Sequence, residues 1–112
     1  MYYIKKRFEV AGCHRLELDY ESPCGRMHGH NWTITVHCRA RTLDQNGMVL
    51  DFKKVKDAIH GALDHRNLND VLPFNPTAEN IARWIAEQVP GCFRVEVQES
   101  EGNVAIWEED AL

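Results

Sequence analysis

The apolar and polar positions of this chain repeat with two different periods, which predicts strands at both ends and helices between them. From Trp32 to Cys38, apolar residues occupy every even position and polar residues occupy the odd positions. This two-residue period predicts a half-buried strand over 28–39. Residues 2–10 mix aromatic and β-branched side chains with charges, which favours another strand.

The middle of the chain changes to turn signals and helical spacing. Asn46-Gly47 suits the left-handed turn of a tight hairpin, so residues 48–50 are expected to run back along the preceding strand. Asp51 then caps a predicted helix, because the apolar residues that follow it recur at helical spacing. This helix is expected to end near Leu63.

A second helix is predicted from the segment Asn75-Pro76-Thr77. Either Asn75 or Thr77 can cap this helix, and Pro76 suits its first turn. Apolar residues continue at helical spacing until Pro90-Gly91, which should end the helix.

Two more strands are predicted at the end of the chain. Residues 93–98 alternate between apolar and polar side chains, and a short strand over 104–107 follows a turn at 101–103. Hairpin-linked strands at both ends favour an antiparallel sheet with two helices packed on one face, the α+β class. No repeat or linker divides the sequence, so one domain is expected over 1–112.

The composition narrows the class of protein. The 112 residues carry a formal net charge of -4, and no basic stripe is large enough to neutralise nucleic-acid phosphates, so no nucleic-acid partner is expected. No apolar run has the length of a signal peptide or a membrane helix, which predicts a cytoplasmic location and no membrane partner. The four cysteines lack C-x-x-C spacing and are predicted to be free thiols. A core this small favours a homo-oligomer.

Three histidines form a candidate metal site. His28 and His30 point the same way in a strand, with only Gly29 between them, and His14 could add a third imidazole from the adjoining strand. Three neutral imidazoles with a fourth position left for water or substrate describe a catalytic zinc site. Ordinary surface or packing histidines are the alternative, because H-x-H spacing alone is weak evidence.

Cys24 and the pair Asp64-His65 are candidate catalytic groups. The Cys24 thiol lies four residues before His28, and a nearby dication would favour its thiolate form, which can act as a base or a nucleophile. A small buried apolar residue is the alternative. Asp64 could orient His65 for proton transfer, whereas adjacent Asp and His residues more often serve as polar residues at a helix end.

Glu99 continues the phase of the apolar residues in the strand over 93–98, so its side chain is expected on the apolar side. A carboxylate in that position needs a basic side chain or a ligand with donor groups, because burying an unpaired charge is costly. The alternative is a residue at the end of the strand that already turns into solvent.

Five ordered segments together resemble the 6-pyruvoyltetrahydropterin synthase and 6-carboxytetrahydropterin synthase family along nearly the whole chain. They are Ala11–Leu16, Cys24–His30, Leu63–Asp70, Asn75–Asn80 and Val95–Glu99. The resemblance implies the T-fold of two antiparallel hairpins and two helices, with subunits assembled as hexamers, each a dimer of trimers. By the same resemblance, zinc would be bound by His14, His28 and His30, Cys24 would be the base, Asp64 and His65 its relay, Glu99 the pterin anchor, and Thr77 a residue of the pterin pocket. Helix capping is the alternative for Thr77.

The gap of three residues between Cys24 and His28 resembles the carboxy-forming branch of this family. That branch implies conversion of 7,8-dihydroneopterin triphosphate to 6-carboxy-5,6,7,8-tetrahydropterin, with release of acetaldehyde and triphosphate, toward queuosine. Arg15 or Arg26 would help to hold the triphosphate in an acidic protein. A pyruvoyl-forming enzyme, a folate-type enzyme in which Glu21 does the base chemistry, and a non-catalytic zinc- or pterin-binding module remain alternatives.

Overall fold

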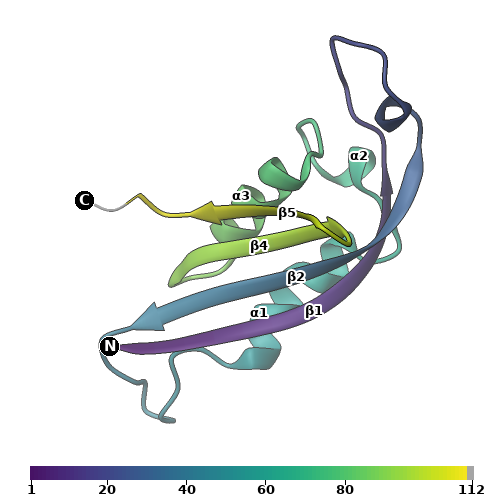
Figure 1. Cartoon of the computed structure of the whole chain (residues 1–112). Helices are drawn as coiled ribbons and strands as arrows, with labels where there is room; N and C mark the ends of the chain where they lie inside the picture. Colours follow the sequence, from purple (N-terminus) through teal and green to yellow (C-terminus); the bar gives the residue numbers. More distant parts are fainter. Residues whose placement is uncertain (111–112) are drawn as a thin grey trace.

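The computed structural model describes residues 1–110, which form one five-stranded sheet with helices against it (Figure 1). The strand order is β3-β1-β2-β4-β5. The strands are β1 Tyr2–His14, β2 His28–Ala40, β3 Arg66–Asn67, β4 Cys92–Ser100 and β5 Asn103–Glu108. The helices are α1 Phe52–Leu63, α2 Leu68–Val71 and α3 Ala78–Gln88, and Pro23–Gly25 forms a single 3-10 turn. Within residues 1–110, no helix has the length and apolarity to cross a membrane.

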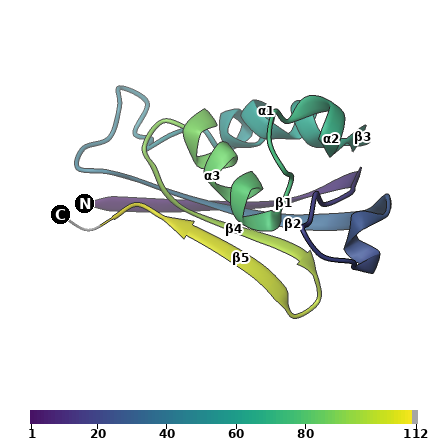
Figure 2. The same ribbon diagram turned by 90° about the horizontal axis from the view of Figure 1, so that it is seen from above.

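All three helices lie on one face of the sheet, as Figure 2 shows, so the predicted α+β class and its one-sided helical layer are confirmed. The even-numbered residues of β1 and β2 point toward the helices and form much of the core with apolar residues of α1 and α3. The opposite face of the sheet carries mostly charged and polar side chains. The largest side chains that are almost completely buried include Trp32, Ile34, Ile59, Leu63, Ile81 and Ile85.

The two long helices begin where the sequence predicts. The Asp51 side chain accepts a hydrogen bond from the Lys53 N–H and caps α1. Thr77 caps α3, because its hydroxyl accepts a hydrogen bond from the Asn80 N–H. Pro76 precedes this cap and lies outside the helix, so its predicted place in the first turn is wrong by two positions.

The predicted hairpin at Asn46-Gly47 is wrong. Residues 41–51 form a loop, in which the Asp44 carboxylate accepts hydrogen bonds from the backbone N–H groups of Asn46 and Met48. Residues 48–50 cannot extend the sheet beside β2, because β1 and β4 already occupy both edges of that strand. The turn signal was therefore real, but no free strand edge was available.

Strand β1 is longer than predicted and continues from Val10 to His14. It pairs with β2 without a break in register, so that His14 lies directly opposite His28. Two short elements were not predicted: β3, which pairs in parallel with Gly12 and Cys13 of β1, and the single-turn helix α2. The sheet is therefore mixed at one edge, and β1 is held on both sides where it reaches the histidines.

The core gives a direct test of this packing. We expect Ile59→Ala to lower the free energy of unfolding by about 2–5 kcal/mol, because Ile59 is completely buried in α1 and its truncation leaves a cavity. Ile106→Ala is the matched control, since Ile106 is 51 % exposed on β5 and should change stability by less than about 0.5 kcal/mol. Urea unfolding followed by circular dichroism measures both values. Equal effects of the two substitutions would contradict the placement of the core.

Candidate active site

Three histidines and one glutamate converge at one end of the sheet. The ligand atoms of His14, His28, His30 and Glu99 all lie within 4.8 Å of one another. His14 comes from the end of β1, His28 and His30 from the start of β2, and Glu99 from β4. The predicted three-histidine cluster therefore forms within one chain.

Backbone carbonyls fix which nitrogen of two of these imidazoles is free. Nδ1 of His14 lies 2.8 Å from the Pro76 carbonyl oxygen, and Nδ1 of His28 lies 2.6 Å from the Arg26 carbonyl oxygen. Because a carbonyl can only accept, each Nδ1 carries the proton and donates it. Nε2 of both rings then keeps a free lone pair, which is the arrangement that metal-binding histidines use.

The free nitrogens lack protein partners, which supports a bound metal. Within residues 1–110, Nε2 of His14 and Nε2 of His30 are buried and have no hydrogen-bond partner. A buried polar atom without a partner costs free energy, and an ion at the centre of the cluster would remove that cost. Three imidazole nitrogens and a carboxylate oxygen form a donor set that suits a divalent transition metal.

Burial favours the metal-binding form of His14 and His30. It lowers the pKa of His14, and the neighbouring His28 adds to this, while the Pro76 carbonyl and Glu99 partly oppose it. Burial likewise lowers the pKa of His30 below its ordinary value, against the raising effect of Glu99. A lowered pKa favours neutral imidazole at physiological pH, and only the neutral ring can donate its lone pair to a metal.

Glu99 lies close to two of the imidazoles but makes no hydrogen bond to either of them. Its carboxylate lies 3.3 Å from Nε2 of His30 and 3.9 Å from Nε2 of His14. The same residue lines a cavity of about 480 Å³ beside the start of α3, together with Ala78 and Glu79. Glu99 can therefore contact either an ion in the cluster or a small molecule in this cavity. Sequence spacing alone did not reveal that a fourth protein group joins the histidines.

Trp32 forms the floor of the cluster. Its ring packs edge-on against His14 and His30, with centroids 4.9 and 5.2 Å apart. Its indole N–H donates a 3.1 Å hydrogen bond to the Gly12 carbonyl, so the ring is fixed to β1. This packing limits the orientations that the two imidazoles can adopt.

Cys24 lies on the exposed 3-10 turn between β1 and β2. Its thiol is accessible, so the alternative of a small buried apolar residue is wrong. The Cys24 N–H donates to the Ser22 hydroxyl, and its carbonyl accepts a hydrogen bond from the Leu16 N–H. Both backbone groups of Cys24 are therefore held, while the sulfur is left free for chemistry.

Asp64 and His65 form a hydrogen-bonded pair at the end of α1. Oδ2 of Asp64 lies 2.7 Å from Nδ1 of His65, and Oδ1 accepts a 2.9 Å hydrogen bond from the Ala11 N–H. The Ala11 N–H is the main reason that the pKa of Asp64 is lowered, and His65 adds to it. With φ at 56°, His65 is the sole non-glycine residue of the described chain at positive φ, a strained conformation that is common at functional sites.

His65 belongs to a second cavity of about 500 Å³, whose lining includes Cys13, His30 and Arg66. Cys24 is not among the residues that line this cavity. Within residues 1–110, no hydrogen bond joins Asp64 or His65 to Cys24. The chain thus assembles the proposed relay pair and the proposed base as two separate units.

The charge of Asp64 should contribute to stability in a pH-dependent way. Because its pKa is lower in the folded than in the unfolded state, its stabilising effect is complete above the ordinary carboxyl range, ~3.9, and is lost as the pH falls below it. We expect Asp64→Asn to lower the urea midpoint at pH 7 and to have a much smaller effect near pH 3. Asp57→Asn, an exposed residue of α1, is the control. A constant difference across the pH range would contradict this account.

Comparison with known proteins shows the family to which this chain belongs. The sequence model of the family described as 6-pyruvoyl tetrahydropterin synthase matches residues 3–110. This chain belongs to that family. The structure of 6-pyruvoyl tetrahydropterin synthase from Caenorhabditis elegans superimposes with a TM-score of 0.79 at 24% identity, covering 97% of this chain and 96% of that one. The structural similarity confirms the predicted T-fold.

Two relatives indicate the range of activities within the family. The 6-carboxy-5,6,7,8-tetrahydropterin synthase of Bacillus subtilis is 26% identical over 93% of this chain and 83% of its own length. The dihydroneopterin monophosphate aldolase of Pyrococcus furiosus is 42% identical, but over only 56% of this chain and 55% of its own length. As a family member, the chain is an enzyme that processes the side chain of a pterin.

The segment that resembles the N-P-T motif of the family contacts the cluster and the cavity beside it. Thr77 caps α3, which confirms the capping interpretation, while its contact with a pterin stays a prediction. Its neighbours Ala78 and Glu79 line the cavity that Glu99 also reaches. The Pro76 carbonyl meanwhile orients His14.

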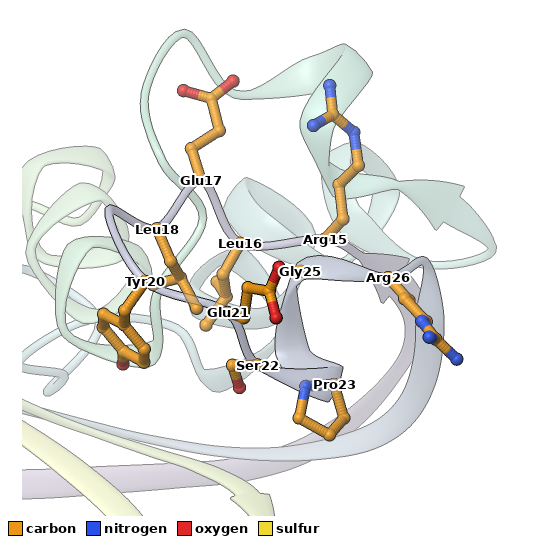
Figure 3. Close-up of a pocket in the computed structure, with 10 residues that line it drawn as sticks. All are labelled: Arg15, Leu16, Glu17, Leu18, Tyr20, Glu21, Ser22, Pro23, Gly25 and Arg26. Carbon is orange, nitrogen blue, oxygen red and sulfur yellow. The ribbon is translucent and has the colours of Figure 1, made fainter.

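The loop that carries Cys24 in this family member encloses a third cavity, of about 720 Å³ (Figure 3). Arg15 and Arg26 line it, and Glu17 and Glu21 line it as well, while a role of the two arginines in holding phosphates stays a prediction. Figure 3 shows both arginine side chains extending away from the Glu21 carboxylate. These four charges balance, so the lining of this cavity is not a strongly positive surface.

Proposed function

We propose that this enzyme is a zinc-dependent 6-carboxytetrahydropterin synthase. It would convert 7,8-dihydroneopterin triphosphate and water to 6-carboxy-5,6,7,8-tetrahydropterin, acetaldehyde and triphosphate, in the cytoplasm and on the route to queuosine. The convergence of His14, His28 and His30 is the observation that carries the proposal. The short gap between Cys24 and His28 and the similarity to the Bacillus subtilis enzyme support the carboxy-forming branch.

The donor set of the cluster fits zinc, which when bound would hold the side-chain hydroxyls of the substrate and acidify them. The fixed tautomers of His14 and His28 keep their Nε2 lone pairs directed to that centre. The Cys24 thiolate would accept a proton from the substrate side chain. Its exposed position leaves it free to approach a bound molecule.

Asp64, His65 and Glu99 complete the proposed roles. Asp64 holds Nδ1 of His65 by a short hydrogen bond, so the opposite nitrogen of the ring is left to exchange protons with the substrate. The Glu99 carboxylate would accept hydrogen bonds from the N–H groups of the pterin in the adjoining cavity. Thr77 would border the same pocket.

Product analysis tests the proposal. Purified zinc-loaded protein incubated with 7,8-dihydroneopterin triphosphate is expected to release acetaldehyde and 6-carboxytetrahydropterin in equal amounts, measured by liquid chromatography and mass spectrometry. A pyruvoyl pterin without acetaldehyde would replace the proposal with the pyruvoyl-forming activity. If the protein binds a pterin but turns over no dihydroneopterin phosphate, the remaining explanation is a non-catalytic binding module.

A second candidate is an aldolase-type cleavage of the dihydroneopterin side chain. The local identity to the Pyrococcus furiosus aldolase favours it, and so does Glu21, a carboxylate in the same loop as Cys24. The matched pair Glu21→Gln and Cys24→Ala separates the candidates. Loss of cleavage of dihydroneopterin monophosphate in Glu21→Gln alone would support the aldolase.

We also propose that the enzyme is a homo-oligomer, a hexamer built as a dimer of trimers. Strand β5 forms a free edge of the sheet, and Val104 and Ile106 on it are about half exposed. The separation of the pair Asp64-His65 from Cys24 suggests that a second copy supplies the relay to each site. Light scattering after size exclusion would give a mass six times that of the chain, and a monomer would contradict the assembly.

A further inference from the structure

Two asparagines outside the proposed catalytic set hold the segment that follows β1. The chain leaves the sheet after His14, so the backbone groups of the next residues have no strand to pair with. Asn69 accepts a 2.8 Å hydrogen bond from the Arg15 N–H and donates a 2.9 Å bond to the Arg15 carbonyl. Asn75 does the same for Glu17, at 2.9 and 3.0 Å.

Each of these amides takes the place of a neighbouring strand. A carboxamide has one acceptor and donors with the geometry of a peptide group, so it can pair with both backbone groups of one residue. The two clamped residues, Arg15 and Glu17, are separated only by Leu16. Backbone N–H and C=O groups outside a strand must bond to other groups or to water. The four hydrogen bonds from Asn69 and Asn75 therefore fix the backbone of residues 15–17.

The asparagines are themselves fixed in place. The Asn69 N–H donates to the side-chain oxygen of Asn67, which caps α2. The Asn75 carbonyl accepts hydrogen bonds from the Thr77 N–H and from the Asn80 side chain, both at the start of α3. The clamps therefore connect the segment to two helices that pack on the sheet.

The clamped segment is hydrogen-bonded to Cys24. The Leu16 N–H, between the two clamped residues, donates a 2.9 Å hydrogen bond to the Cys24 carbonyl. Asn75 also precedes Pro76, whose carbonyl orients His14 of the metal cluster. The clamped residues 15–17 are thus bonded to the turn that carries the thiol, whereas the orientation of His14 depends on the separate carbonyl of Pro76.

We propose that Asn69 and Asn75 are positioning residues that hold the Cys24 turn at a fixed distance from the histidine cluster. The inference rests on the proposed role of Cys24 as the base. The clamps act on the backbone of residues 15–17 and touch neither the cluster nor the thiol. Their loss should therefore displace the base and leave the metal in place.

Separate readouts test this in Asn69→Ala and Asn75→Ala. With 7,8-dihydroneopterin triphosphate, kcat is expected to fall roughly 10–100-fold at nearly constant KM, because a displaced catalytic group costs rate more than binding. Zinc content should equal that of the wild type. Amide hydrogen exchange in peptides covering 15–25 should become faster, and the pH profile of iodoacetamide modification at Cys24, read by peptide mass, should shift.

Two sets of variants complete the test. Asn69→Asp and Asn75→Asp keep the acceptor but set a carboxylate oxygen against the Arg15 or Glu17 carbonyl, so both should release the segment as the alanine variants do. Asn46→Ala, in the loop over 41–51, is the matched control and should behave as wild type.

Unchanged exchange and alkylation in all four clamp variants would overturn the proposal, and so would zinc loss in parallel with the loss of rate. If the wild type has no pterin turnover, the proposed function fails instead. The exchange and alkylation profiles then still decide whether the clamps hold the turn.

Discussion

Replacement of His14 by alanine is expected to abolish metal binding and turnover together. His14 is fully buried, its Nδ1 is already committed to the Pro76 carbonyl, and its Nε2 points into the cluster without a partner. Removal of one of three imidazoles should weaken zinc binding by about 100-fold or more, beyond the effect of losing an outer hydrogen bond. Zinc analysis after gel filtration and the product assay measure the two losses.

His37→Ala is the control for this prediction. His37 lies near the other end of β2, where its imidazole pairs with Glu96 at 2.7 Å. The control variant should retain full zinc content, which separates an effect of the cluster from a general effect of losing a histidine. A His14→Ala protein that still binds one zinc ion per chain would refute the assignment of the cluster.

Cys24→Ala should give the opposite combination, with full zinc content and almost no turnover. The thiol is not part of the cluster of His14, His28, His30 and Glu99, so the ion should remain. Loss of a positioned general base lowers kcat by about 10²–10⁴-fold. Steady-state kinetics with 7,8-dihydroneopterin triphosphate, together with metal analysis of the same sample, gives both numbers.

Cys13→Ala provides the matched comparison. Cys13 lies in β1 beside His14, is partly exposed, and its sulfur donates a hydrogen bond to the Arg66 carbonyl. Its removal should change kcat by less than about 3-fold, because Cys13 lines the cavity of His65 but has no proposed role in proton transfer. If Cys24→Ala turned over substrate as fast as Cys13→Ala, another group would have to be the base.

Local pattern was sufficient to predict most of the fold. The alternation from Trp32 to Cys38 and the caps Asp51 and Thr77 depend on neighbours in the sequence, and the structure confirms them. The hairpin at 46–50 failed because the turn signal is local, whereas the availability of a strand edge depends on the whole sheet. Strand β3 has only two residues, too few to show any period.

The same distinction applies to the candidate site. His28 and His30 are paired by the period of one strand, so the sequence predicts that they converge. Glu99 joins them only because β4 pairs with β2 in one particular register, which no spacing in the sequence encodes. The two asparagine clamps were hidden for a similar reason, since each connects residues more than 50 positions apart.

The pairing of His14 with His28 fixes the register of β1 and β2, whereas the linker between Cys24 and His28 is not part of either strand. A slip of one residue between β1 and β2 would carry His14 to the opposite face of the sheet and remove it from the cluster, so the register of these strands must be kept at this end. The three residues between Cys24 and His28 lie outside the strands, and among them the Arg26 carbonyl, which holds Nδ1 of His28, is the part that must keep its place. Lengthening or shortening this tether would move the sulfur while the ion stays where it is, which gives a simple physical route by which one scaffold can acquire different pterin chemistries.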